Sequence, residues 1–255
     1  MEVRATVATV HPADEIDAIV FDMGGVFVIP DPEVIASIVA EAGVELVLDA
    51  EGARRGHYHG VAAIAALERD GRVEDEIVEH DLSIWEAYDR AYFTSAGLVG
   101  AALEAAMSAR DATRRRGDSA AIWKHVLVEN RQAFVTLASL RPAAVVTNNN
   151  GTAVQQCTDF ELCQVGPGPL PEVAAIVDSG VLGVAKPDPR IFAPALEALG
   201  TAPARTLYVG DTVHADVRGA RNAGLPVVQL DPYELHDDHD HWRLPDLVAL
   251  LDHLT

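Results

Sequence analysis

Short apolar runs recur along the chain and are separated by stretches with helical periodicity. The runs are continuous rather than alternating, which is typical of strands buried on both faces of a parallel sheet. Helical patterns cover residues 119–140, 187–199 and 215–223, and the last two end at glycines. The order strand, helix, strand predicts an α/β fold with a doubly wound parallel sheet. The five predicted strands are residues 16–21, 143–146, 173–177, 206–209 and 226–230.

Residues 31–115 interrupt this alternation. The stretch is rich in Ala, Glu, Val and Leu at helical spacing and contains no strong strand run. Three consecutive arginines at residues 114–116, followed by Gly117, mark its end. We therefore predict that residues 1–30 and 116–255 form the α/β core, and that residues 31–115 form a helical insertion.

Composition and charge exclude several kinds of partner. The 255 residues include 19 Lys and Arg against 39 Asp and Glu, a formal net charge of -20 that repels nucleic acid and anionic membranes. A phosphate site in such a chain would need its own local positive charge. No apolar run approaches the ~20 residues of a membrane span, and the first residues do not resemble a signal peptide. Two cysteines, too few for a disulfide framework or a zinc site, suit a reducing compartment. We expect a soluble, cytoplasmic protein of undetermined oligomeric state.

Polar residues follow the predicted strands at the points where the strands end. Asp22 comes directly after the first run, Thr147 after the second, and Asp211 after the fourth with its preceding Gly210. The carboxyl ends of parallel strands meet at one edge of a sheet, where such folds bind their ligands. We therefore expect these side chains to converge, together with those of Lys186 and Asp216.

Three carboxylates in one cleft predict a metal ion. The side chains of Asp22, Asp211 and Asp216 would repel one another, and some would take up protons unless a cation were present. Magnesium prefers a few carboxylates together with water and substrate phosphate. A carboxylate beside such a cation can also attack phosphorus and form an aspartyl-phosphate.

The remaining groups suit a phosphoryl substrate. The Thr147 hydroxyl can donate a hydrogen bond to a phosphoryl oxygen, and Lys186 supplies a fixed positive charge. Gly24 and Gly25 let the backbone approach closely, so that their amides can point at the phosphoryl group.

These segments together resemble the haloacid dehalogenase (HAD) superfamily. Their order is Asp-x-Gly-Gly-Val, Thr-Asn, Lys-Pro-Asp-Pro-x-x-Phe and Val-Gly-Asp-x-x-x-x-Asp, and residues 177–192 are especially similar to members with a small helical cap. The resemblance implies a Rossmann-like core and a cap at residues 31–115. It implies a magnesium-dependent phosphatase that acts on a small phosphorylated metabolite. It assigns Asp22 as nucleophile, Thr147 and Lys186 to the phosphoryl group, Met23, Gly24, Gly25 and Asn148 to the substrate, and Asp22, the Gly24 carbonyl, Asp211 and Asp216 to magnesium.

One position departs from the family pattern and keeps two alternatives open. Phosphatases of the family usually carry a second Asp two positions after the nucleophile, as general acid and base, and this chain has Gly24 there. Metal-free 2-haloacid dehalogenases also lack that acid, but their fourth motif resembles Ser and Asn rather than Gly-Asp. A degenerate binding or regulatory module is the third interpretation.

Two further features have less specific interpretations. Asp216 falls in a first helical turn, where the helix dipole favours an acid without any metal. The sequence His-Asp-Asp-His-Asp-His at residues 236–241 suggests metal ligands, but no regular spacing joins them. We interpret it as a solvated loop.

Overall fold

The computed structural model describes residues 10–69, 82–117, 121–236 and 240–255. The chain divides into two compact units. The first, called the core unit here, combines Met1–Phe27 with Val128–Thr255. The second, called the inserted unit, is Val28–Leu127.

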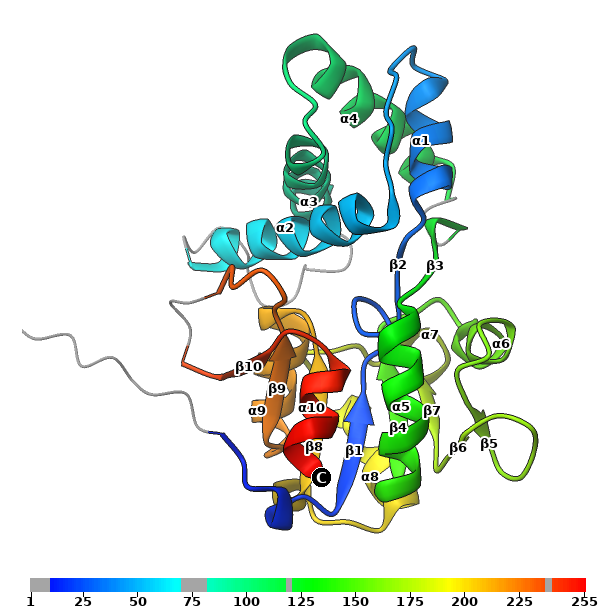
Figure 1. The fold of residues 1–255 in the computed structure, drawn as a ribbon, viewed down its shortest axis with the longest axis vertical. Helices are drawn as coiled ribbons and strands as arrows, with labels where there is room; N and C mark the ends of the chain where they lie inside the picture. The colour runs from blue at the N-terminus through cyan, green and yellow to red at the C-terminus, as the bar shows by residue number, and fades with distance from the viewer. Residues whose placement is uncertain (1–9, 70–81, 118–120, 237–239) are drawn as a thin grey trace, which may run out of the picture. The chain divides into compact units, whose positions relative to one another are not determined.

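A parallel sheet of six strands organises the core unit (Figure 1). All of its neighbouring strands run parallel, and β1 lies in the middle between β8 and β4. The strands that carry the predicted catalytic residues are buried along their whole length. This confirms the α/β, Rossmann-like fold class. In spatial order the strands are β10 (Trp242–Leu244), β9 (Val227–Leu230), β8 (Thr206–Gly210), β1 (Ala18–Phe21), β4 (Ala143–Thr147) and β7 (Ile176–Asp178).

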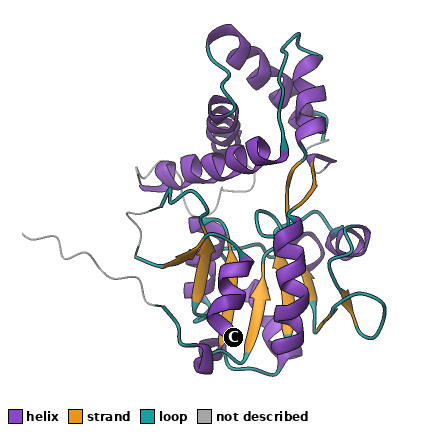
Figure 2. Cartoon of the chain, in the orientation of Figure 1, coloured by secondary structure: helices purple, strands orange, loops and turns teal. Residues whose placement is uncertain are grey.

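Helices cover both faces of this sheet (Figure 2). On one face, α5 (Val128–Leu140) packs beside α10 (Leu247–Leu254), and Phe134 contacts the rings of Phe21 and Phe27. On the other face, η3 (Pro189–Phe192), α8 (Ala193–Leu199) and α9 (Gly219–Asn222) enclose a second apolar cluster. The remaining elements of the core unit are η1 (Ala13–Glu15), α6 (Ala153–Asp159), β5 (Gln164–Val165), β6 (Glu172–Val173), α7 (Ser179–Leu182), η4 (Pro203–Arg205) and η5 (Val213–Arg218).

Two predicted elements are wrong in part. The helix expected at residues 119–140 begins only at Val128, because Trp123–Val126 forms a strand, β3, that pairs with β2 (Val28–Pro30). Residues 119 and 120 lie outside the described part of the chain. The strand expected at residues 173–177 is split, since Val173 pairs with Val165 in a separate small sheet and only β7 joins the main one.

The inserted unit is mainly helical and has its own core. Its helices are α1 (Pro32–Ala40), α2 (Ala50–Arg69), α3 (Leu82–Ser95) and α4 (Gly100–Arg115). Aromatic residues of α3, including Tyr88, Tyr92 and Phe93, are buried in its centre. No helix among the described residues is long and apolar enough to cross a membrane.

Candidate active site

The loop after β1 presents Asp22 at the carboxyl edge of the sheet. The Asp22 amide continues the strand ladder by donating to the Val209 carbonyl at 2.8 Å. Beyond Met23, which is buried, Gly25 adopts a positive φ of 66°, a conformation that favours glycine. Asn130 on α5 then holds the end of the loop by donating to the Val26 carbonyl at 2.7 Å. The nucleophile candidate therefore stands on a turn that is fixed at both ends.

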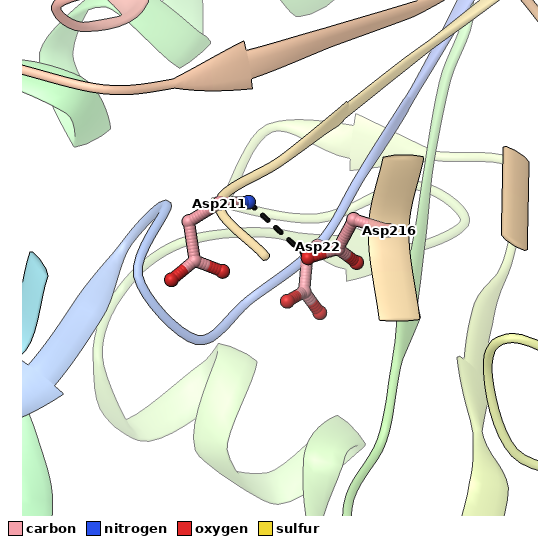
Figure 3. Close-up of side chains that lie close together, drawn as sticks. All are labelled: Asp22, Asp211 and Asp216. Carbon is pink, nitrogen blue, oxygen red and sulfur yellow. Dashed lines mark hydrogen bonds between the residues drawn. The ribbon is translucent and has the colours of Figure 1, made fainter. Parts of the chain in front are cut away.

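Three buried carboxylates converge at this edge, as predicted. Asp22, Asp211 and Asp216 each offer an oxygen within 4.8 Å of the others (Figure 3). They come from three places, the ends of β1 and β8 and the first turn after β8. Parallel strands thus gather the groups that the sequence separates by up to 194 positions, from residue 22 to residue 216.

Lys186 is the cation of this group. Its ammonium Nζ lies 2.8 Å from Asp22 Oδ1 and 2.7 Å from Asp216 Oδ1. Burial disfavours the ammonium charge, but the two carboxylates outweigh it and raise the pKa of Lys186 above its ordinary value. Lys186 therefore stays positive at neutral pH.

Asp22 is a weaker acid than an ordinary aspartic acid side chain. Burial raises its pKa from 3.8 to about 7; Lys186 opposes this shift, whereas Asp216 and Asp211 add to it. Its Oδ1 lies 2.8 Å from the Lys186 ammonium as an ion-pair partner, and no other described residue donates a hydrogen bond to it. Full ionisation of Asp22 at neutral pH therefore calls for a positive charge in addition to Lys186.

Asp216 has a different environment, in which both carboxylate oxygens are occupied. Its Oδ1 accepts hydrogen bonds from Lys186 and from the Tyr208 hydroxyl at 2.8 Å. Its Oδ2 accepts from the Thr212 hydroxyl at 2.6 Å, the Thr212 amide at 2.9 Å and the Asp211 amide at 3.2 Å. Burial acts to raise the pKa of Asp216, but Lys186 and Thr212 hold it below its usual value. This carboxylate organises the loop that carries Asp211.

Thr147 and Asn148 lie at the end of β4, on the same edge. Thr147 is buried as the last residue of the strand. The Asn148 side chain pairs with the backbone of Lys186, accepting from its amide at 2.8 Å and donating to its carbonyl at 3.0 Å. Asn148, predicted to contact the substrate, thus holds the segment that presents Lys186.

Asp178, which the sequence did not single out, supports this edge. Asp178, the last residue of β7, accepts from the amides of Gly151 at 3.0 Å, Ala153 at 2.9 Å and Gly180 at 2.8 Å. It therefore fixes the loop that follows Thr147. An Asp at the end of a short strand has the same sequence pattern as an ordinary turn, so nothing in the sequence distinguished it.

The interpretation of residues 236–241 as a solvated loop is wrong for its two ends. His236 and His241 are 1% and 3% exposed, and both contact the buried Gln229 side chain. Gln229 in turn donates to the Asp211 carbonyl at 2.7 Å. Residues 237–239 lie outside the described part. The histidines belong to a buried polar network behind Asp211, which forms because β10 returns the chain to the sheet beside β9.

Comparison with known proteins agrees with this geometry. The sequence profile of haloacid dehalogenase-like hydrolases matches residues 16–224. The chain belongs to this family. The resemblance inferred from the four motifs is thereby confirmed, and the matched region contains every predicted site residue of this HAD hydrolase.

Individual relatives share either part of the sequence or the fold. A phosphoserine phosphatase of Thermus thermophilus is 37% identical over 108 residues, which cover 42% of this chain and 42% of that protein. The chain thus matches less than half the length of this curated relative. Among solved structures, the magnesium-bound HAD-hydrolase YfnB of Bacillus subtilis is 15% identical with a TM-score of 0.55, covering 94% of this chain and 99% of that one.

A 2-haloacid dehalogenase from Pseudomonas syringae pv. tomato has the same fold. It is 18% identical with a TM-score of 0.51 and covers 94% of this chain and 98% of that chain. At such identities the likeness concerns the fold alone. The choice between phosphate and haloacid chemistry therefore depends on the side chains at the carboxyl edge.

Proposed function

We propose that this HAD hydrolase is a magnesium-dependent phosphatase that cleaves a small phosphorylated metabolite through an aspartyl-phosphate at Asp22. The observation that carries the proposal is the buried Asp22 carboxylate, which lies 2.8 Å from the Lys186 ammonium and beside two more buried carboxylates. The phosphatase name of the Thermus relative supports the same class of substrate.

The charge balance of the site fits a divalent cation. Three ionised carboxylates and one ammonium leave two net negative charges in a buried cluster. Burial raises the pKa of Asp22, and the neighbouring Asp216 and Asp211 carboxylates add to that shift. Asp22, Asp211 and the Gly24 carbonyl would hold magnesium, while Asp216 has its oxygens occupied by hydrogen bonds. When bound, the ion would ionise Asp22 and neutralise charge on the phosphoryl oxygens.

The chain's own residues supply the chemical steps. The ionised Asp22 oxygen attacks phosphorus, a new O–P bond forms, and the bond to the ester oxygen of the substrate breaks. Lys186 and the Thr147 hydroxyl stabilise the charge on the equatorial phosphoryl oxygens. Water then attacks phosphorus, which releases inorganic phosphate and returns the Asp22 carboxylate.

Metal-free dehalogenation is the competing function, and Gly24 is the observation that favours it. Asp211 and Asp216, which follow β8, argue against it, because two acids beside Asp22 would repel a carboxylate substrate unless a metal ion were bound. We further propose that residues 31–115 act as the cap that selects the leaving group. The acidic composition and the free cysteines support a cytoplasmic protein with no nucleic-acid or membrane partner.

Gly24 leads to a prediction about substrates. Without a general acid at this position, an alkoxide must leave without its proton, whereas p-nitrophenolate or acetate departs readily. With Mg²⁺, the protein should therefore hydrolyse acetyl phosphate and p-nitrophenyl phosphate at least about a hundredfold faster than simple alkyl phosphates. Phosphate release over a series of leaving groups measures this.

Gly24→Asp provides the matched test. Gly24, unlike Gly25, does not have a positive φ, so an Asp can adopt its backbone conformation. The variant should reduce the ratio between the hydrolysis rates of aryl and alkyl phosphates.

Halide release from 2-chloropropionate in EDTA, with no phosphate release, would establish the dehalogenase instead. Turnover of neither substrate class would favour the binding module.

A further inference from the structure

Tyr208 is a fully buried residue whose hydroxyl lies within the charged cluster. It stands on β8, three positions before Asp211, and its ring packs edge-on against Phe192 at 5.1 Å between centroids. The ring belongs to the apolar cluster on one face of the sheet. The hydroxyl, in contrast, accepts a hydrogen bond from Lys186 Nζ at 2.9 Å and donates to Asp216 Oδ1 at 2.8 Å.

These contacts constrain how the Lys186 ammonium is oriented. An ammonium has three N–H donors in a fixed tetrahedral arrangement. Two of them are used by Tyr208 and Asp216, whose own positions are tied together by the bond between the phenol and the carboxylate. The third is thereby directed to the side where Asp22 Oδ1 lies, 2.8 Å from Nζ.

We propose that Tyr208 is a positioning residue, which orients the Lys186 ammonium so that one N–H remains directed at the Asp22 side of the site. Tyr208 acts through Lys186 and touches neither nucleophile nor substrate. The kinetic part of this inference rests on the proposed phosphatase function, whereas the geometric part does not.

Tyr208→Phe removes only the hydroxyl and keeps the ring that packs on Phe192. The Lys186 ammonium then loses a hydrogen-bond acceptor and can rotate about its remaining partners. We expect kcat for acetyl phosphate to fall by about ten- to a hundredfold, with KM little changed, because the loss concerns alignment in the transition state.

The ammonium itself gives a readout that does not depend on activity. The sequence contains only two lysines, Lys124 and Lys186, so protein labelled with ¹⁵N-lysine has two side-chain ammonium groups. Lys124 is exposed and Lys186 is buried. Only Lys186 should give a slowly exchanging ammonium signal, assigned by its absence in Lys186→Met. In Tyr208→Phe, its proton exchange should accelerate by about tenfold or more.

Thr206→Val is the matched control. Thr206 lies two positions before Tyr208 on the same strand, is equally buried, and loses in the variant a hydroxyl bonded to Thr201 at 2.8 Å and to the Ala202 carbonyl at 3.0 Å. It should lower stability without changing kcat or the Lys186 signal. A Tyr208→Phe protein with natural kcat and an unchanged ammonium signal would overturn the proposal.

The outcomes also separate this inference from the proposed function. If no phosphate ester is hydrolysed, the change of the Lys186 signal still decides whether Tyr208 orients the ammonium. If Tyr208→Phe does not fold, the proton exchange of the Lys186 ammonium in the natural protein tests the proposal. A Lys186 ammonium that exchanges there as fast as that of Lys124 shows that no fixed orientation exists.

Discussion

Asp22→Asn should reduce phosphate release by a factor on the order of 10⁴ or more, because the amide keeps the shape of the side chain but cannot attack phosphorus. The fold should persist, since the Asp22 backbone, rather than its side chain, continues the β1 ladder. Steady-state rates with acetyl phosphate and Mg²⁺ measure the loss. Turnover close to that of the natural protein would show that another residue is the nucleophile.

The same substitution should stabilise the metal-free protein in a pH-dependent way. Asp22 has a folded-state pKa of about 7 against an ordinary value of 3.8, so between these values the folded protein holds a proton that the unfolded chain has lost. Stability therefore falls as pH rises from about 4 to 7. An Asn has no such penalty, and the variant should gain on the order of 2 kcal/mol near pH 8.

Thermal unfolding in EDTA at several pH values measures this gain. The difference between Asp22→Asn and the natural protein should be largest above about pH 7 and shrink toward pH 4. Asp17→Asn is the control, since Asp17 is an exposed acid paired with Arg205 and lies outside the site. A gain in stability that does not depend on pH would contradict the raised pKa of the buried Asp22.

Magnesium should have the second large effect, on stability and on turnover. A cation that binds only the folded protein stabilises it by about 2.7 kcal/mol at a hundredfold excess over its dissociation constant, which raises Tm by roughly 5–10 °C in a chain of this size. The increase should follow the Mg²⁺ concentration to saturation. Turnover should be lost in EDTA and return when Mg²⁺ is restored.

Asp211→Asn tests which side chains bind the ion. It should remove most of the Mg²⁺-dependent rise in Tm and reduce turnover by about a hundredfold or more, while Asp17→Asn should retain both. Because the Tm change needs no substrate, it separates loss of metal binding from loss of catalysis. Full activity in EDTA, with a Tm that does not change when Mg²⁺ is added, would exclude a metal-dependent mechanism.

The clustering of these side chains at the carboxyl edge of the sheet could be predicted from the sequence, because its cause is local. Asp22, Thr147 and Asp211 each follow a short run of apolar residues, and such runs form buried parallel strands whose ends must meet. Lys186 could be added because its Lys-Pro-Asp segment has a recognisable pattern. These four positions needed no knowledge of long-range contacts beyond the parallel sheet itself.

The supporting residues could not be predicted, because their roles arise from distant partners. Tyr208 has the pattern of a core residue until Lys186 and Asp216 are placed beside its hydroxyl. His241 is buried only because β10 returns to the sheet and brings it to Gln229. The strand at Trp123–Val126 likewise depends on its pairing with β2, which apolar spacing alone does not reveal.

The central claim is that Asp22 carries the phosphoryl group during turnover. The most direct test mixes the protein with acetyl [³²P]phosphate and Mg²⁺, quenches with acid during turnover, and maps the label. We expect a hydroxylamine-sensitive acyl phosphate on the peptide that contains Asp22, absent from Asp22→Asn and from samples in EDTA. Rapid phosphate release with no labelled carboxylate, or with the label on another residue, would contradict the account.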